Sequence, residues 1–94
     1  MKKIQVMLVD DSASVRQTLT KILEDSDDIE VMAAVGDPYL AVARIAAQVP
    51  DVIVLDIEMP RMDGLTFLQQ IMTQHPIPTI ICSSLAVEGS DSIL

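Results

Sequence analysis

The sequence predicts an α/β fold of the doubly wound class, an open parallel sheet with helices on both faces. Two observations carry this prediction. Short apolar runs rich in β-branched residues alternate with longer stretches whose apolar residues recur every three or four positions. The apolar runs are also nearly continuous, which is typical of strands buried on both faces of a parallel sheet. Strands that alternate with helices imply right-handed crossovers, and therefore parallel strands.

Composition narrows the class of protein further. The chain has 94 residues, enough for one domain, and half of them are hydrophobic, so it should fold. The formal net charge of −8 argues against nucleic-acid binding, because the phosphate backbone requires basic partners. The single cysteine, Cys82, cannot form an intrachain disulfide, and no apolar run approaches the roughly 20 residues of a membrane span. We therefore expect a cytoplasmic protein that binds neither nucleic acid nor membrane.

The first strand and helix are predicted at residues 4–9 and 12–24. The run "IQVMLV" carries no charge and stops at two acids, Asp10 and Asp11. In the stretch that follows, the apolar residues that share one helix face are Val15, Leu19, Ile22 and Leu23. Ser12 or Asp11 can cap the start of this helix, and an acidic run at its far end stops it.

A second pair is predicted at residues 29–35 and 38–49. We expect Gly36 to turn the chain and Asp37 to cap the helix. Pro38 then stands at the first helical position, where its missing N–H costs nothing. The apolar stripe of this helix consists of Val42, Ile45, Ala46 and Val49. The next proline ends the helix.

The third pair and a fourth strand follow the same plan. The run "DVIVLD" predicts a buried strand at residues 51–56. The helix after it presents a stripe made of Leu65, Leu68, Ile71 and Met72. "HPIP" breaks this helix, and "TIICS" predicts a strand at residues 79–83. The remaining residues, "SLAVEGSDSIL", are expected to form a loop with at most one or two helical turns.

Carboxylates follow two of the predicted strands. Asp10 and Asp11 come at the end of the first strand, and Asp56 ends the third. Ligands of open parallel sheets bind at the carboxyl ends of the strands, so these acids converge if the two strands are neighbours. At about 5 Å and an effective dielectric constant of about 20, each pair would repel by about 3 kcal/mol. Such a cluster either takes up protons or binds a cation, and its oxygen ligands suit Mg²⁺.

A rigidly held carboxylate beside Mg²⁺ is suited to accept a phosphoryl group, with an aspartyl phosphate as the product. Plainer interpretations also exist. Asp10 and Asp11 can simply cap the helix that follows them, where the helix dipole favours acids, and Asp56 can be a turn residue. The placement of all three acids at strand ends favours the site.

These residues carry a resemblance. "VMLVDDSASVRQTL", "PDVIVLDIEMPRMDGLTFL" and "PTIICSS" resemble a response-regulator receiver domain, with its acid pair, its lone aspartate, its Met-Pro-x-Met-Asp-Gly turn and its small hydroxyl residue. "GDPYLAVARI" and "ICSSLAVEGS" are similar to the N-terminal receiver of the chemotaxis protein-glutamate methylesterase, the CheB family. The resemblance implies a flavodoxin-like (CheY-like) receiver fold with strand order 2-1-3-4-5.

The resemblance also implies roles for single residues. Asp56 would be the phospho-acceptor of a two-component system, taking the phosphoryl group from a phosphorylated chemotaxis-type histidine kinase. Asp11 would bind Mg²⁺ directly and Asp10 mainly through water, with the backbone carbonyl of Glu58 as a further metal ligand. Ser83 would bind a phosphoryl oxygen and act as the switch hydroxyl in signal transduction.

The resemblance implies more structure than the 94 residues supply. A receiver has five strands and five helices, so we expect residues 1–94 to be a receiver domain that stops before strand 5, its lysine and helix 5. The output domain would lie elsewhere in the parent, which is expected to be a protein-glutamate methylesterase, while this segment is regulatory. The fourth strand would then be an exposed edge, so the chain is expected either to be a truncated fragment or to pair through this edge with a second copy.

Two other functions remain open at this point. The chain can be the receiver of another response regulator, one with a DNA-binding output or one that stands alone. It can also be a phosphatase that uses Asp56 as nucleophile and Glu58 as proton shuttle, although Pro60 follows this pair awkwardly. The sequence of the output domain would show whether the chain is the receiver of another response regulator. Turnover of a phosphoester by the intact protein would support the phosphatase.

Overall fold

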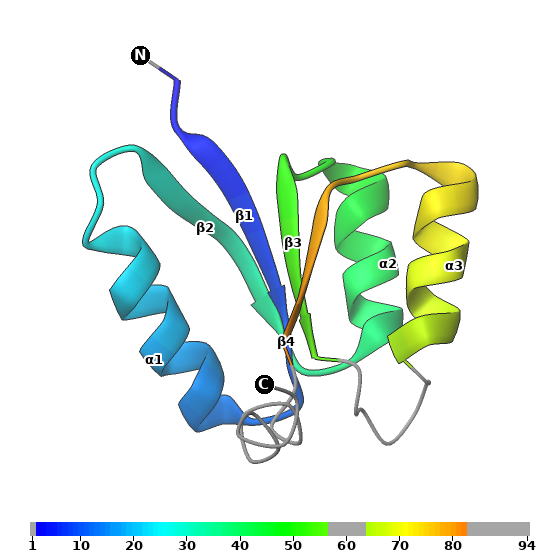
Figure 1. Cartoon of the computed structure of the whole chain (residues 1–94), viewed down its shortest axis with the longest axis horizontal. Coiled ribbons are helices and arrows are strands. Elements are labelled where there is room, and N and C mark those ends of the chain that lie inside the picture. The colour runs from blue at the N-terminus through cyan, green and yellow to red at the C-terminus, as the bar shows by residue number, and fades with distance from the viewer. Residues whose placement is uncertain (1, 57–63, 83–94) are drawn as a thin grey trace, which may run out of the picture.

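The computed structural model describes residues 2–56 and 64–82 (Figure 1). In this part of the chain, strands and helices alternate as predicted. The elements are β1 (Ile4–Val9), α1 (Ala13–Glu24), β2 (Ile29–Val35), α2 (Pro38–Ala47), β3 (Val52–Asp56), α3 (Gly64–Gln74) and β4 (Thr79–Cys82). The predictions for Glu58 and Ser83 concern residues outside this part.

The strands form one parallel sheet in the order β2-β1-β3-β4. Figure 1 shows α1 on one face of the sheet, with α2 and α3 together on the other. This arrangement confirms the doubly wound fold class. It also confirms that β1 and β3 are neighbours, so that the residues following β1 and ending β3 lie at the same edge of the sheet. The fold therefore brings the predicted acidic ends together.

The main core lies between the sheet and the pair α2 and α3. Its buried members are Met7, Val9, Ala33, Ala41, Ile45, Ile53, Leu55, Phe67, Ile71 and Ile77. The largest of them is Phe67, whose side chain is 1% exposed. The core includes alternate residues of the two central strands, Met7 and Val9 of β1 and Ile53 and Leu55 of β3, as expected for strands that present alternate side chains to the two faces.

The predicted stripe of α2 is wrong in all but one position. Of its four residues only Ile45 is buried; Val42 is 38% exposed, and Val49 is 49% exposed and lies beyond the helix, which ends at Ala47 and not at the predicted residue 49. The buried face instead runs through Pro38, Ala41 and Ile45. Apolar periodicity alone does not choose between two adjacent stripes, because the small side chain of Ala41 looks neutral in the sequence. In the structure, that small side chain is fully buried.

The helix α1 covers its face of the sheet incompletely. All of its residues are described, and none of them is buried. Of its predicted stripe, Leu19 and Leu23 are half-buried, while Val15 is 37% and Ile22 61% exposed. Its packing contacts are chiefly with β2. The helix is correctly predicted, but its burial is only partly so.

The predicted starts of the first two helices are confirmed. The hydroxyl of Ser12 accepts a hydrogen bond of 3.3 Å from the backbone N–H of Val15, so Ser12 is the cap of α1. A carboxylate oxygen of Asp37 accepts one of 2.7 Å from the N–H of Tyr39, and Pro38 takes the first helical position.

Within residues 2–56 and 64–82, no helix has both the length and the apolar character needed to cross a membrane.

Candidate functional site

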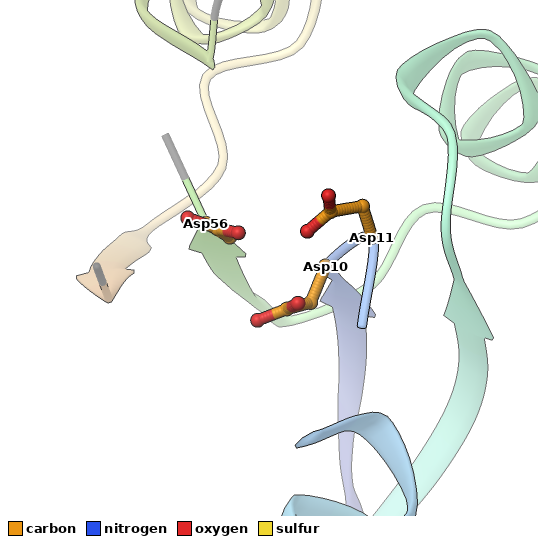
Figure 2. A group of neighbouring side chains, drawn as sticks. All are labelled: Asp10, Asp11 and Asp56. Carbon is orange, nitrogen blue, oxygen red and sulfur yellow. The ribbon is translucent and has the colours of Figure 1, made fainter. Parts of the chain in front are cut away.

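Three carboxylates meet at the carboxyl end of the sheet. Asp10 follows β1, Asp11 comes next, and Asp56 is the last residue of β3. Each offers a carboxylate oxygen, and these oxygens all lie within 4.8 Å of one another. Figure 2 shows the three side chains gathered around one small space between the two strand ends. The convergence that the sequence predicted is therefore present.

The pairing of the strands explains this convergence. Val9 pairs with Leu55 in the parallel ladder between β1 and β3, so the next residue on each strand is Asp10 or Asp56. Both of these acids are buried, each with 8% of its surface exposed, whereas Asp11 is exposed. The site thus has two carboxylates at its base and one at the side open to solvent.

Several hydrogen bonds hold Asp10 in place. Its backbone N–H donates to the carbonyl of Val35 on β2 at 3.0 Å. Its carboxylate oxygen Oδ1 accepts a hydrogen bond of 2.8 Å from the N–H of Ser12. In both of these hydrogen bonds the partner of Asp10 is a backbone group. The bond from Ser12 closes a short turn between Asp10 and Ser12, and Ser12 is also the cap of α1. The end of β1 is therefore connected directly to the start of α1.

The charges of the cluster favour a cation. Carboxylates about 5 Å apart at an effective dielectric constant of about 20 repel by about 3 kcal/mol for each pair. Hard divalent ions such as Mg²⁺ bind such oxygen ligands, usually through one or two carboxylates with water completing the shell. Asp10, Asp11 and Asp56 fit that donor set, and Asp11 lies on the side of the cluster that is exposed to solvent.

One basic residue near the site was not singled out by the sequence analysis. Arg16 lies on α1, and its Nη1 donates a hydrogen bond of 2.6 Å to the backbone carbonyl of Asp10. The signal was present in the sequence, since Arg16 stands four residues after the helix cap. The direction in which its side chain turns back could be known only from the tertiary structure.

The comparisons with known proteins agree with the fold described above. The family model of the response regulator receiver domain matches residues 6–92. A protein-glutamate methylesterase/protein-glutamine glutaminase of Rhizobium johnstonii is 56% identical over 93 residues, which are 99% of this chain and 26% of the relative. The chain thus spans about a quarter of the length of the curated relatives it matches.

Two solved structures have a fold similar to that of this chain. The response regulator domain of Thermotoga maritima CheB is 39% identical with a TM-score of 0.85, and the match covers 98% of this chain and 69% of that one. A chain in the structure of the P1 domain of CheA3 in complex with CheY6 from R. sphaeroides is 35% identical with a TM-score of 0.80. That match covers 98% of this chain and 72% of the other.

Proposed function

Because the chain belongs to the response regulator receiver domain family and is a receiver of the CheB type, we propose that Asp56 is its phospho-acceptor and that Asp10, Asp11 and Asp56 bind Mg²⁺. The observation that carries this proposal is the convergence of these three carboxylates at one edge of the sheet. The backbone carbonyl of Glu58 is proposed as a further metal ligand and Ser83 as the switch hydroxyl, both by the resemblance.

The proposed reaction is a phosphoryl transfer. A carboxylate oxygen of Asp56 attacks the phosphorus of a phosphohistidine, a new P–O bond forms, and the P–N bond to the donor breaks. The released imidazole takes up a proton. Bound Mg²⁺ would offset the negative charge of the phosphoryl oxygens. Asp56 suits the role of nucleophile because the end of a buried strand presents its carboxylate rigidly, so little entropy is lost in orienting it.

Phosphoryl labelling tests the proposed acceptor. Acetyl phosphate with Mg²⁺ should label the longer parent protein, and mass spectrometry should locate the label on Asp56. A label on another residue of this domain would contradict the assignment.

The metal site has its own test. Replacement of Asp11 by Ala removes the carboxylate on the open side of the cluster and should weaken Mg²⁺ binding by at least about tenfold, since even groups that only orient metal ligands have effects of that size. Calorimetric titration of the 94-residue chain measures the affinity. Asp27→Ala, which removes an exposed acid from the turn before β2, is the matched control. Equal affinities of the Asp11 variant and the wild type would argue against this ligand.

The proposed partner that donates the phosphoryl group is a phosphorylated chemotaxis-type histidine kinase in the cytoplasm. One structural neighbour is a complex of the P1 domain of CheA3 with CheY6, which supports a kinase domain of that kind as the donor. The proposed output is a methylesterase domain in the same parent protein, in line with the names of the curated relatives. A Ser-His-Asp hydrolase sequence after residue 94 of the parent would support this output, and a basic DNA-binding module would replace it.

We further propose that β4 pairs with β4 of a second copy. It is the outermost strand of the sheet formed by the described residues. Ile80 and Ile81 are 58% and 49% exposed on its two sides, and Thr79–Cys82 contains no charged residue or proline to block pairing. Because the net charge of −8 opposes association, the dimer should be favoured by salt, which screens that repulsion.

Self-association is measured by sedimentation of the 94-residue chain over a range of protein concentrations, in low and high salt. We expect a dimer at high concentration that Ile80→Lys converts to a monomer. Val49→Lys, a change at another exposed apolar position, outside β4, is the control. A species that stays monomeric at high concentration, with the intact chain confirmed by mass, would refute the pairing.

A further inference from the structure

The side chain of Arg16 lies beside the acidic cluster, where three segments meet: α1, the end of β1 and the residue after β2. Arg16 lies at the end of the first turn of α1, where its own N–H donates to the carbonyl of Ser12 at 3.0 Å. Its guanidinium turns back toward β1 and donates to the carbonyl of Asp10 at 2.6 Å, in a partly buried position. A cation near a helix N-terminus is disfavoured by the helix dipole, so this contact has to offset an unfavourable location.

Gly36 provides the space for this guanidinium. A Cβ atom at residue 36 would lie 2.6 Å from Nη1 of Arg16, 3.3 Å from its Cζ and 3.5 Å from the carbonyl oxygen of Asp10. No glycine among the described residues has a positive φ, so the backbone at Gly36 does not itself require glycine. The interpretation of Gly36 as a turn residue is therefore incomplete. In the structure, its missing side chain is what lets Arg16 reach Asp10.

The bond from Arg16 acts on a peptide plane. The carbonyl of Asp10 and the N–H of Asp11 belong to the same planar peptide unit. A donor that holds the carbonyl therefore also sets the direction in which the chain enters Asp11. Asp11 is the exposed member of the cluster, and its carboxylate needs a fixed backbone if it is to stay within reach of the two buried ones.

We propose that Arg16, seated on Gly36, is a positioning residue for the metal site: it holds the Asp10–Asp11 peptide so that the carboxylate of Asp11 is presented to Mg²⁺. This inference rests on the proposed function, in which these acids bind Mg²⁺. It adds two residues, Arg16 and Gly36, that are not themselves proposed as ligands of the metal or of the phosphoryl group.

Two different substitutions should have the same effect. Arg16→Gln removes the long donor, and Gly36→Ala leaves the donor present but displaces it. Since the atom that a new Cβ would meet is the far end of a flexible side chain, the Gly36 variant should still fold, which thermal unfolding checks. Each variant should bind Mg²⁺ about tenfold more weakly, the lower end of the range for groups that orient metal ligands.

A double-mutant cycle separates positioning from general damage. If Arg16 and Gly36 act through one contact, the double variant should bind Mg²⁺ no more weakly than either single variant. Additive losses would overturn the proposal. Without metal, the amide NMR signal of Asp11 should move in the same direction in both single variants, because both release the same peptide plane. Arg16→Lys should retain part of the affinity, since its slimmer ammonium can still donate to the carbonyl.

The sign of the effect is decisive. If Arg16 acted only through its charge, its removal would strengthen Mg²⁺ binding, because a cation near the site repels the metal, and Gly36→Ala would have little effect. Stronger binding by Arg16→Gln would therefore overturn the inference. Asp11→Ala distinguishes a failure of the proposed metal site from a failure of the positioning role. If that variant binds Mg²⁺ as the wild type does, the proposed metal site fails; if it loses binding while the Arg16 and Gly36 variants keep it, only the positioning role fails.

Discussion

The Asp56→Asn variant of the parent protein is expected to take up no phosphoryl group from acetyl phosphate in the presence of Mg²⁺. Asparagine has nearly the same shape, but its amide is a poor nucleophile and carries no negative charge. Phosphoryl incorporation measured by intact-mass spectrometry should fall to background.

The control for this result is Asp27→Asn, which removes the same formal charge from an exposed turn at a distance from the cluster. It should label as the wild type does. Persistence of the label in the Asp56 variant would refute the acceptor assignment. Thermal unfolding of the Asp56 variant, which should stay folded because asparagine has nearly the same shape, tests whether a loss of labelling comes from unfolding.

Phe67→Ala is expected to lower the free energy of unfolding by about 3–5 kcal/mol. Phe67 is 1% exposed and belongs to the core cluster between α3 and the sheet. Removal of its ring takes away buried apolar surface and leaves a cavity that the rigid sheet cannot close. Since small domains are stable by only about 5–15 kcal/mol, this single change threatens the fold. Urea unfolding of the 94-residue chain measures the change.

Two further variants make the stability result interpretable. Phe67→Leu keeps most of the volume and should cost about 1–2 kcal/mol, so it should remain folded even if the alanine variant does not. Val49→Ala, at a position that is 49% exposed, should change stability by less than about 0.5 kcal/mol. A cost below about 1 kcal/mol for Phe67→Ala would contradict its place at the centre of the core.

The sequence was sufficient to predict the alternation of elements and the candidate site. Nearly continuous apolar runs made β1 and β3 recognisable, because strands buried on both faces of a parallel sheet carry few polar residues. The acids at Asp10, Asp11 and Asp56 stood out because each follows such a run. In a parallel sheet the ends of neighbouring strands lie together, so a linear pattern could predict a cluster in space. The caps Ser12 and Asp37 were predictable for a similar reason, since they act on their own neighbours in the chain.

Only the tertiary structure decided the contacts that depend on how elements rotate and where long side chains turn. Periodicity located α2 but chose the wrong stripe, and the burial of Ala41 followed from close approach to the sheet. It located α1 but did not show how exposed that helix is. The contact between Arg16, Gly36 and Asp10 joins segments that neighbour one another only after folding. Local propensity and strand-end position can be inferred from the order of residues, whereas helix rotation and side-chain reach depend on the shape of the surface that each element meets.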